Sequence, residues 1–444
     1  MPADVFDHME EAWKLEKNPF PLEAIRAQRV EQPYSPTVFS QEENAFRRKL
    51  IRGGINGGQA IGFLWSQRLR ADTGFGKTTL MQEAAREINS DLGATTLQKA
   101  GVKKSAPPIA AAFSNLNNLN ASGLYPVLFN AVVDLATPPD ASGTSVLAKA
   151  RQRIVDELGS DDFDAIADRV RTSWMAIGGT GAPLRPELII AFASGGNRLK
   201  SVLSEVSPTA RLRNGLQYLD FALAVLAAAG IDHLFLMIDQ LEDLATNRSV
   251  TSPKRSREIG RIRDLLESVP YASRLHMVFT FHNRAAQVLD RFWEENRLPS
   301  FEVSPSNTSA VVVLGGIKDT DQAKELLRVY LEDARTEPVE DELLPFEPGA
   351  VDVLREVSDG RPGILLSRAR ELVNAAAEQV PSRILAPNPH RQVSPSGYRS
   401  GYCGPLSTRA SGVRPGRPRS RAAENGDELA PVVHSITSSA TSRA

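Results

Sequence analysis

The sequence has a single cysteine, Cys403, among 444 residues. One thiol excludes a disulfide framework within the chain and a metal site built from cysteines, and such scarcity is typical of a reducing compartment. An excess of one charge is also lacking, because 52 Lys and Arg balance 53 Asp and Glu and leave a net charge of -1. No overall field therefore attracts nucleic acid or a basic partner, and any such surface must be local.

Long apolar runs are missing as well. Residues 1–20 carry acidic side chains early and lack the apolar segment of a signal peptide. The longest apolar stretch, YLDFALAVLAAAGIDHLFLMI, is interrupted by Gly230, Asp232 and His233, which predicts a helix followed by a strand instead of a membrane span. We therefore expect a cytoplasmic protein without a membrane segment, in which 41% hydrophobic residues suffice for a sizeable core.

Apolar strands and amphipathic helices alternate along most of the chain. Short apolar runs predict strands at residues 61–70, 109–118, 233–238, 275–283 and 310–317, with helical patterns between them. This alternation is typical of an α/β fold, a mainly parallel sheet flanked by helices on both faces.

The composition predicts a division into domains. We expect an N-terminal segment of helix and turns over residues 1–60, an α/β core over 61–317 with a helical insertion at 137–210, and a small helical domain over 318–382. Residues 383–444 are rich in Ser, Pro, Gly and Arg, contain no lysine and lack hydrophobic periodicity, which predicts a disordered tail. Its arginines could contact nucleic acid, although a solvated tail is the simpler interpretation.

The stretch LRADTGFGKTTL, residues 69–80, approximates the phosphate-binding pattern G-x-x-x-x-G-K-[ST]. An alanine stands at the first glycine of the pattern, but it keeps its backbone N–H and adds only a methyl group. We expect this loop to hold phosphates through its N–H groups at the start of a helix, with Lys77 reaching the β and γ phosphates and Thr78 binding Mg²⁺. The predicted cofactor-binding residues are Ala71, Asp72, Thr73, Gly74, Phe75, Gly76, Lys77, Thr78 and Thr79.

A second motif, HLFLMIDQLED, places Asp239 directly after an apolar strand, with Glu242 and Asp243 close behind. A magnesium nucleotide needs a carboxylate at the tip of a neighbouring strand, and its hydrolysis needs a second acid that orients water. This motif supplies both, so the two motifs together predict a site for ATP and Mg²⁺.

The motifs resemble those of the AAA+ and related signal-transduction P-loop ATPases, and within them the origin-recognition-like and transposition-helper-like branch. ADTGFGKTTL is similar to Walker A, HLFLMIDQLED to Walker B, VFTFHN to the sensor-1 strand and GAVDVLREVSDGRPGILLSRARELV to the helical lid. The upstream NPFP is more weakly similar to the short N-terminal motif of the transposition-helper ATPases. The resemblance covers residues 15–380 and implies a P-loop ATPase core followed by a lid.

The resemblance also implies roles for single residues. Asp239 becomes the carboxylate that binds Mg²⁺, and Glu242 becomes the acid that activates water. Asn283 becomes the sensor of the γ-phosphate, with His282 or Thr280 as alternatives.

Two further features concern arginines. Arg297, in EENRLPSF, stands where such families often place an arginine finger that acts on a neighbouring subunit. The lid motif, usually G-x-P-R, here reads GRPG at residues 360–363, so Gly363 replaces the sensor-2 arginine, for which Arg361 or Arg368 are candidate substitutes.

Three functions are compatible with these patterns. The first is an ATPase that hydrolyses Mg-ATP to switch a DNA- or protein-processing complex, with homo-oligomers formed through nucleotide interfaces and DNA or a DNA-processing protein as a partner implied by the family alone. The second is a nucleotide-binding scaffold with little hydrolysis, for example in phage defence or signalling. The third is a helical interaction protein with a degenerate site.

Overall fold

The computed structural model describes residues 9–21, 33–57, 60–66, 74–103, 105–116, 123–138, 143–179, 183–247, 250–280, 283–298 and 310–379. The centre of the fold is a five-stranded sheet with the strand order β2-β3-β4-β1-β5. Every neighbouring pair of strands is parallel. The strands are β1 (Ile61–Ser66), β2 (Ile109–Asn115), β3 (His233–Asp239), β4 (Leu275–Thr280) and β5 (Val311–Leu314). The predicted α/β fold with a parallel sheet is therefore confirmed.

Successive residues of each strand enter two different hydrophobic cores, because side chains in a strand alternate between the faces of the sheet. Phe63 and Trp65 of β1 belong to one core, whereas Leu64 between them belongs to the other. All six residues of β1 are buried, as expected for a strand covered on both faces.

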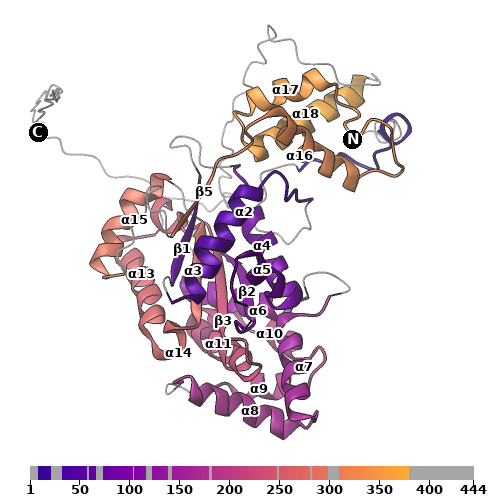
Figure 1. The fold of residues 1–444 in the computed structure, drawn as a ribbon. Helices are drawn as coiled ribbons and strands as arrows, with labels where there is room; N and C mark the ends of the chain where they lie inside the picture. Colours follow the sequence, from indigo (N-terminus) through magenta and orange to yellow (C-terminus); the bar gives the residue numbers. More distant parts are fainter. Residues whose placement is uncertain are drawn as a thin grey trace, which may run out of the picture. The chain divides into compact units, whose positions relative to one another are not determined.

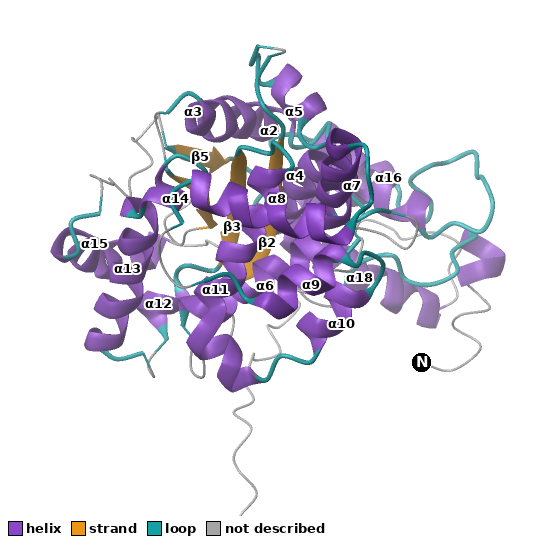
Figure 2. Ribbon diagram, turned by 90° about the horizontal axis from the view of Figure 1, so that it is seen from below, coloured by secondary structure: helices purple, strands orange, loops and turns teal. Residues whose placement is uncertain are grey.

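A smaller group of helices covers the face of the sheet that Leu64 enters. Its members are α2 (Ser40–Phe46), the π-helical turn η1 (Arg47–Ile51), α3 (Arg52–Ile55), α4 (Lys77–Asp91) and α5 (Ala94–Lys99). Helix α4 ends where Leu92 and Gly93 adopt left-handed backbone angles. A β-carbon at Gly93 would lie 2.2 Å from Ile109, so glycine alone fits between this helix and β2. Figure 2 shows the strands between this group and the helices of the opposite face.

The opposite face carries a larger helical layer. It consists of α6 (Leu124–Ala136), α7 (Val146–Leu158), α8 (Phe163–Ala176), α9 (Pro186–Ala193), α10 (Arg198–Ser204), α11 (Pro208–Ala228), α12 (Asp243–Thr246), α13 (Ser252–Glu267), α14 (Val269–Ala272) and α15 (Asn283–Glu295). Side chains from α7 to α10 join the same core as those of α6 and α11. The helices α7 to α10 lie within the predicted insertion and pack on α6, α11 and one another (Figure 1).

A third core joins the two ends of the described chain. The helices α16 (Thr320–Asp333), α17 (Pro348–Val357) and α18 (Pro362–Gln379) form the predicted small helical domain, here called the lid. Phe20 of the NPFP stretch packs among them, with ring centroids 6.1 Å from Tyr330 and 5.8 Å from Phe346. The side-chain amide of Asn18 donates to the Arg370 carbonyl at 3.1 Å and to the Asn374 side chain at 2.8 Å. The NPFP stretch thus fastens the N-terminal segment to the lid.

The predicted domain boundaries stay a prediction, and the tail at residues 383–444 lies outside the described residues. Among the helices that are described, none has the length and apolar character needed to cross a membrane.

Candidate functional site

The described end of the loop between β1 and α4, residues 74–76, lies beside Asp239 at the carboxyl end of the sheet. Gly74 and Gly76 have φ angles of 84° and 80°, the left-handed region in which glycine is favoured. Gly76 is also the N-cap of α4, and the Phe39 ring packs so closely that a β-carbon at Gly76 would lie 3.0 Å from it. The backbone N–H groups at the start of α4 and its dipole therefore favour an anion beside Lys77.

Asp239, the last residue of β3, is 2% exposed and connects three elements. Its Oδ2 accepts a hydrogen bond from Thr78 Oγ1 of α4 at 2.7 Å, and its Oδ1 accepts one from Thr280 Oγ1 of β4 at 2.5 Å. The Gln240 backbone N–H donates to both Asp239 Oδ1, at 3.0 Å, and Thr280 Oγ1, at 2.8 Å. Since β4 lies between β1 and β3, Thr280 fixes the carboxylate from the intervening strand.

The oxygens of Thr78 and Asp239 fit a magnesium ion. Mg²⁺ binds oxygen ligands at 2.0–2.1 Å in octahedral geometry, so neighbouring ligands lie roughly 2.9 Å apart. The separation of 2.7 Å between Thr78 Oγ1 and Asp239 Oδ2 is close to that value. The described residues contain no group of three or more His, Cys, Asp or Glu that could enclose a metal. A hydroxyl and one carboxylate match the few protein ligands that Mg²⁺ takes beside water and phosphate.

Glu242 follows in the turn after β3. Burial raises the pKa of its carboxyl to about 7, with the negative charges of Asp239 and Asp243 acting in the same direction and the Lys77 ammonium opposing them. A carboxyl with this pKa takes up and releases a proton near neutral pH, as a general base does.

These groups line one cavity of about 400 Å³. Its walls come from the loop and the start of α4, from the turn after β3, from the N-terminal segment and from the lid. Tyr34 and Phe39 of the N-terminal segment stack on each other, with ring centroids 5.6 Å apart, and both line the cavity. Tyr330 and Leu366 line it from the lid. The wall is thus polar at the loop and apolar between the N-terminal segment and the lid.

Several predicted site residues fall within this arrangement. Gly74, Phe75, Gly76, Lys77, Thr78, Thr79, Asp239 and Glu242 all line the cavity. Ala71, Asp72 and Thr73 lie outside the described residues, as do His282 and the side chain of Asn283. The roles assigned to the site residues by the family resemblance stay predictions.

The three candidate arginines, Arg297, Arg361 and Arg368, are not among the described residues that line the cavity. Arg297 is exposed beyond the end of α15, with a φ of 51°. Arg361 Nε donates to the Ser358 carbonyl at 3.3 Å, and Arg368 pairs with Glu371 at 2.6 Å.

Sequence reasoning missed two contributions. The family resemblance offers Thr280 only as an alternative phosphate sensor, whereas its hydroxyl donates a hydrogen bond to Asp239. The sequence motifs assign no role to Tyr34, yet this residue lines the cavity. An aromatic residue ahead of a helix that packs on the loop is the signal that would have pointed to it.

Comparisons with known proteins add little. No protein-family model and no curated protein matches this chain. Among solved structures, the crystal structure of Cdc6p from Pyrobaculum aerophilum matches with 11% sequence identity and a TM-score of 0.37. The match covers 81% of this chain and 66% of that one. A similarity of this size carries no weight, so the fold is defined by the sheet, its strand order and the helices on its two faces.

Proposed function

We propose that this chain binds Mg-ATP in the cavity at the carboxyl end of the sheet and hydrolyses it to switch its conformation or assembly. The proposal depends above all on the convergence of Thr78, Asp239 and Thr280 beside the loop that carries Lys77. A glycine-rich loop, a hydroxyl and a buried carboxylate are the groups that hold a magnesium-bound triphosphate.

The cavity suits the whole nucleotide. In this proposal the phosphates lie against the loop and the start of α4, where the helix dipole and Lys77 offset their charge. Thr78 and Asp239 hold Mg²⁺, which when bound neutralises charge on the β and γ phosphates. In this proposal the base lies against the apolar part of the wall, to which Tyr34 and Tyr330 belong. A volume of about 400 Å³ is within the range of small-molecule sites.

Glu242 is the proposed general base. It accepts a proton from the water that attacks the γ-phosphorus, the bond between the γ-phosphorus and the bridging oxygen breaks, and ADP leaves with that oxygen. The raised pKa of Glu242 matches the group to this task near neutral pH.

The proposal extends to partners through the family resemblance. Arg297 is exposed, which is compatible with an arginine finger that completes the site of a neighbouring copy. DNA or a DNA-processing protein is the further partner that we propose from the resemblance alone.

One observation favours the alternative of a scaffold with little hydrolysis. The lid carries Gly363 at the cavity wall, and Arg361 and Arg368 bond elsewhere in the lid. A site without a second cation holds a nucleotide but stabilises the charge of the transition state less.

Measurements of ATP binding and turnover, with and without DNA, test the proposal. We expect Lys77→Ala to weaken ATP binding about 10- to 100-fold, because a charge-assisted contact is lost. We expect Glu242→Gln to retain binding and lose turnover by about 10²- to 10⁴-fold. Glu83→Gln is a matched control, because Glu83 also belongs to the α4 region but lines another cavity.

The outcomes separate the alternatives. A wild-type protein that binds no ATP would overturn both the ATPase and the scaffold. Binding without turnover in the wild type, unchanged in Glu242→Gln, would select the scaffold.

A further inference from the structure

Glycines from three segments meet beside the phosphate loop. They are Gly74 of the loop itself, Gly316 in the linker from β5 to the lid, and Gly360 and Gly363 at the start of α18. The Gly363 backbone N–H donates to the Gly74 carbonyl oxygen at 2.8 Å. This is a direct backbone hydrogen bond between the lid and the loop, at the position where the family pattern has an arginine side chain.

Only glycine fits at position 363. A β-carbon there would lie 2.9 Å from the Gly74 α-carbon and 3.3 Å from its carbonyl oxygen. Both are backbone atoms, which cannot rotate aside as a flexible side chain does. Any other residue at position 363 would therefore push α18 away from the loop and lengthen or break the hydrogen bond.

The linker is attached to the same place. The Ile317 N–H donates to the Gly360 carbonyl at 2.7 Å, which ties the exit of β5 to the turn before α18. The Phe75 ring, 2% exposed, packs under this linker, because a β-carbon at Gly316 would lie 3.2 Å from it. The residue that follows Gly74 in the loop thus contacts the linker on which the lid is carried.

The hydrogen bond also fixes part of the loop. A trans peptide is planar and its carbonyl and N–H point in opposite directions. The bond to Gly363 therefore sets the direction of the Gly74 carbonyl and, with it, of the Phe75 N–H. If the lid moves away from the loop, the peptide between Gly74 and Phe75 loses the hydrogen bond that orients it. If the loop rearranges around phosphate, the Gly74 carbonyl that accepts the hydrogen bond from Gly363 moves with it.

We propose that Gly363 is a positioning residue that couples the lid to the phosphate loop by a backbone latch, defined as the Gly363 N–H to Gly74 carbonyl hydrogen bond with the close glycine contact around it. The inference rests on the proposed nucleotide site. It replaces the reading of Gly363 as a lost arginine: the lid contacts the loop through main-chain atoms in place of a charged side chain.

Two substitutions test the latch. We expect Gly363→Ala to weaken ATP binding about 5- to 10-fold, the equivalent of one lost hydrogen bond. Gly363→Arg restores the residue of the family pattern, and we expect it to weaken binding by at least about tenfold, because the larger side chain separates lid and loop further. Gly349→Ala in α17 is the matched control, since a β-carbon there meets no atom within 4 Å, and it should bind ATP as the wild type does.

Amide hydrogen exchange of the intact protein gives a second readout that does not require a variant to fold. Pro362 has no N–H, so slow exchange at the start of α18 reports on Gly363 and Ile364. We expect the Gly363 amide to be protected in the protein without nucleotide and more strongly with ATP. In Gly363→Ala the amides of the loop at residues 74–76 should exchange faster, a change that Gly349→Ala does not produce.

Each outcome of these experiments either supports or overturns the latch. Gly363→Arg binding ATP as well as the wild type or better would show that position 363 is a vacant arginine site, and the latch would be wrong. An unprotected Gly363 amide, or wild-type binding and loop exchange in Gly363→Ala, would overturn it too. If the wild type binds no ATP, the proposed function fails by itself, while exchange in the nucleotide-free protein still decides whether the latch forms.

Discussion

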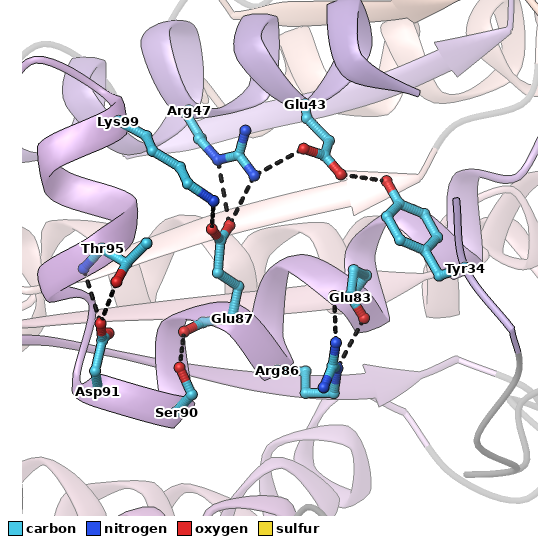
Figure 3. A network of polar contacts seen from close by, with 10 residues as sticks. All are labelled: Tyr34, Glu43, Arg47, Glu83, Arg86, Glu87, Ser90, Asp91, Thr95 and Lys99. Carbon is cyan, nitrogen blue, oxygen red and sulfur yellow. Dashed lines mark hydrogen bonds and ion pairs between the residues drawn. The ribbon is translucent and has the colours of Figure 1, made fainter. Parts of the chain in front are cut away.

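Helix α4 borders two cavities that use charge in opposite ways. At its amino end lies the proposed nucleotide cavity with Lys77 and Thr78. A second cavity, of about 220 Å³, is lined by Glu83 and Glu87 of the same helix. In this second cavity the acids and bases pair with one another (Figure 3). Arg47 donates to Glu43 at 2.8 Å and to Glu87 at 2.9 Å, Lys99 donates to Glu87 at 2.6 Å, and the Tyr34 hydroxyl donates to Glu43 at 2.7 Å.

The two cavities shift the pKa of a glutamate in opposite directions. Burial alone would raise the pKa of Glu87, but hydrogen bonds from Lys99 and Arg47 bring it below its ordinary value. For Glu242 burial prevails over the attraction of Lys77 and raises the pKa to about 7. A carboxylate held ionised by two cations stabilises the fold, whereas one poised near neutrality is suited to proton transfer.

Among the substitutions that compare the two cavities, the largest effect should be the loss of stability on substitution of Arg47, the centre of the paired network. Its side chain is 11% exposed, and it bridges Glu43 and Glu87, which join α2 to α4. We expect Arg47→Met to lower the free energy of unfolding by about 2–3 kcal/mol, because the partly buried Glu43 loses its bond to Arg47 and Glu87 is left with Lys99 alone of its two cations. Chemical denaturation measures this loss, and ATP affinity should change less than about threefold.

Removal of the carboxylates provides the control for that prediction. The triple variant Arg47→Met, Glu43→Gln, Glu87→Gln should recover part of the lost stability, since the unpaired charges are gone. A loss below about 0.5 kcal/mol in Arg47→Met would contradict the structural role.

Thr280 provides the next largest effect, in the other cavity. Thr280→Val keeps the shape of the side chain but removes the hydroxyl that donates to Asp239 and accepts from the Gln240 N–H. We expect turnover to fall about tenfold and to require more Mg²⁺, because a misplaced carboxylate is a poorer ligand. A magnesium titration of turnover measures both. Turnover with an unchanged magnesium requirement would show that Thr280 does not position Asp239.

Much of the fold could be predicted from the sequence because its signals are local. LFLMI is apolar throughout and is followed by acids, which predicts a buried strand with carboxylates at its carboxyl end, and the structure has β3 there. The strand order could not be predicted, since period and composition do not specify which strands pair. The pairing of β4 with β3, which brings Thr280 to Asp239, is a tertiary result.

The residues of the candidate site also divide into those that the sequence predicts and those that depend on tertiary contacts. Lys77, Thr78 and Asp239 stand in motifs, and the motifs meet as their chemistry requires. Tyr34 and Gly363 could not be assigned, because both depend on contacts between segments far apart in the chain. The family pattern identified Gly363 as a departure, but the neighbouring Gly74 that makes it necessary is visible only in three dimensions.

A pH profile sharpens the contrast between the two glutamates. The ratio kcat/KM reports ionisations of the free enzyme. Because Glu242 must be ionised to accept a proton, we expect kcat/KM to rise with pH through an apparent pKa of about 7 and to reach about half of its plateau at pH 7. Glu87 has a lowered pKa and stays ionised over this range, so Glu87→Gln should leave the midpoint unchanged. A midpoint near 4.5 would contradict the assignment of Glu242.

The smallest effect should be the loss of stability on substitution of Lys99, which binds the same carboxylate, Glu87, as Arg47. Its side chain is 50% exposed, against 11% for Arg47, so water compensates most of what Lys99→Ala removes. Glu87 also keeps its bonds to Arg47. We expect the free energy of unfolding to fall by about 0.5 kcal/mol and ATP binding to remain as in the wild type. Denaturation and ATP titration of Lys99→Ala, Arg47→Met and Lys77→Ala would then compare three cations on or beside one helix. We expect Arg47 to govern stability and Lys77 to govern ATP binding. Lys99 should govern neither, because water already solvates its exposed ammonium group.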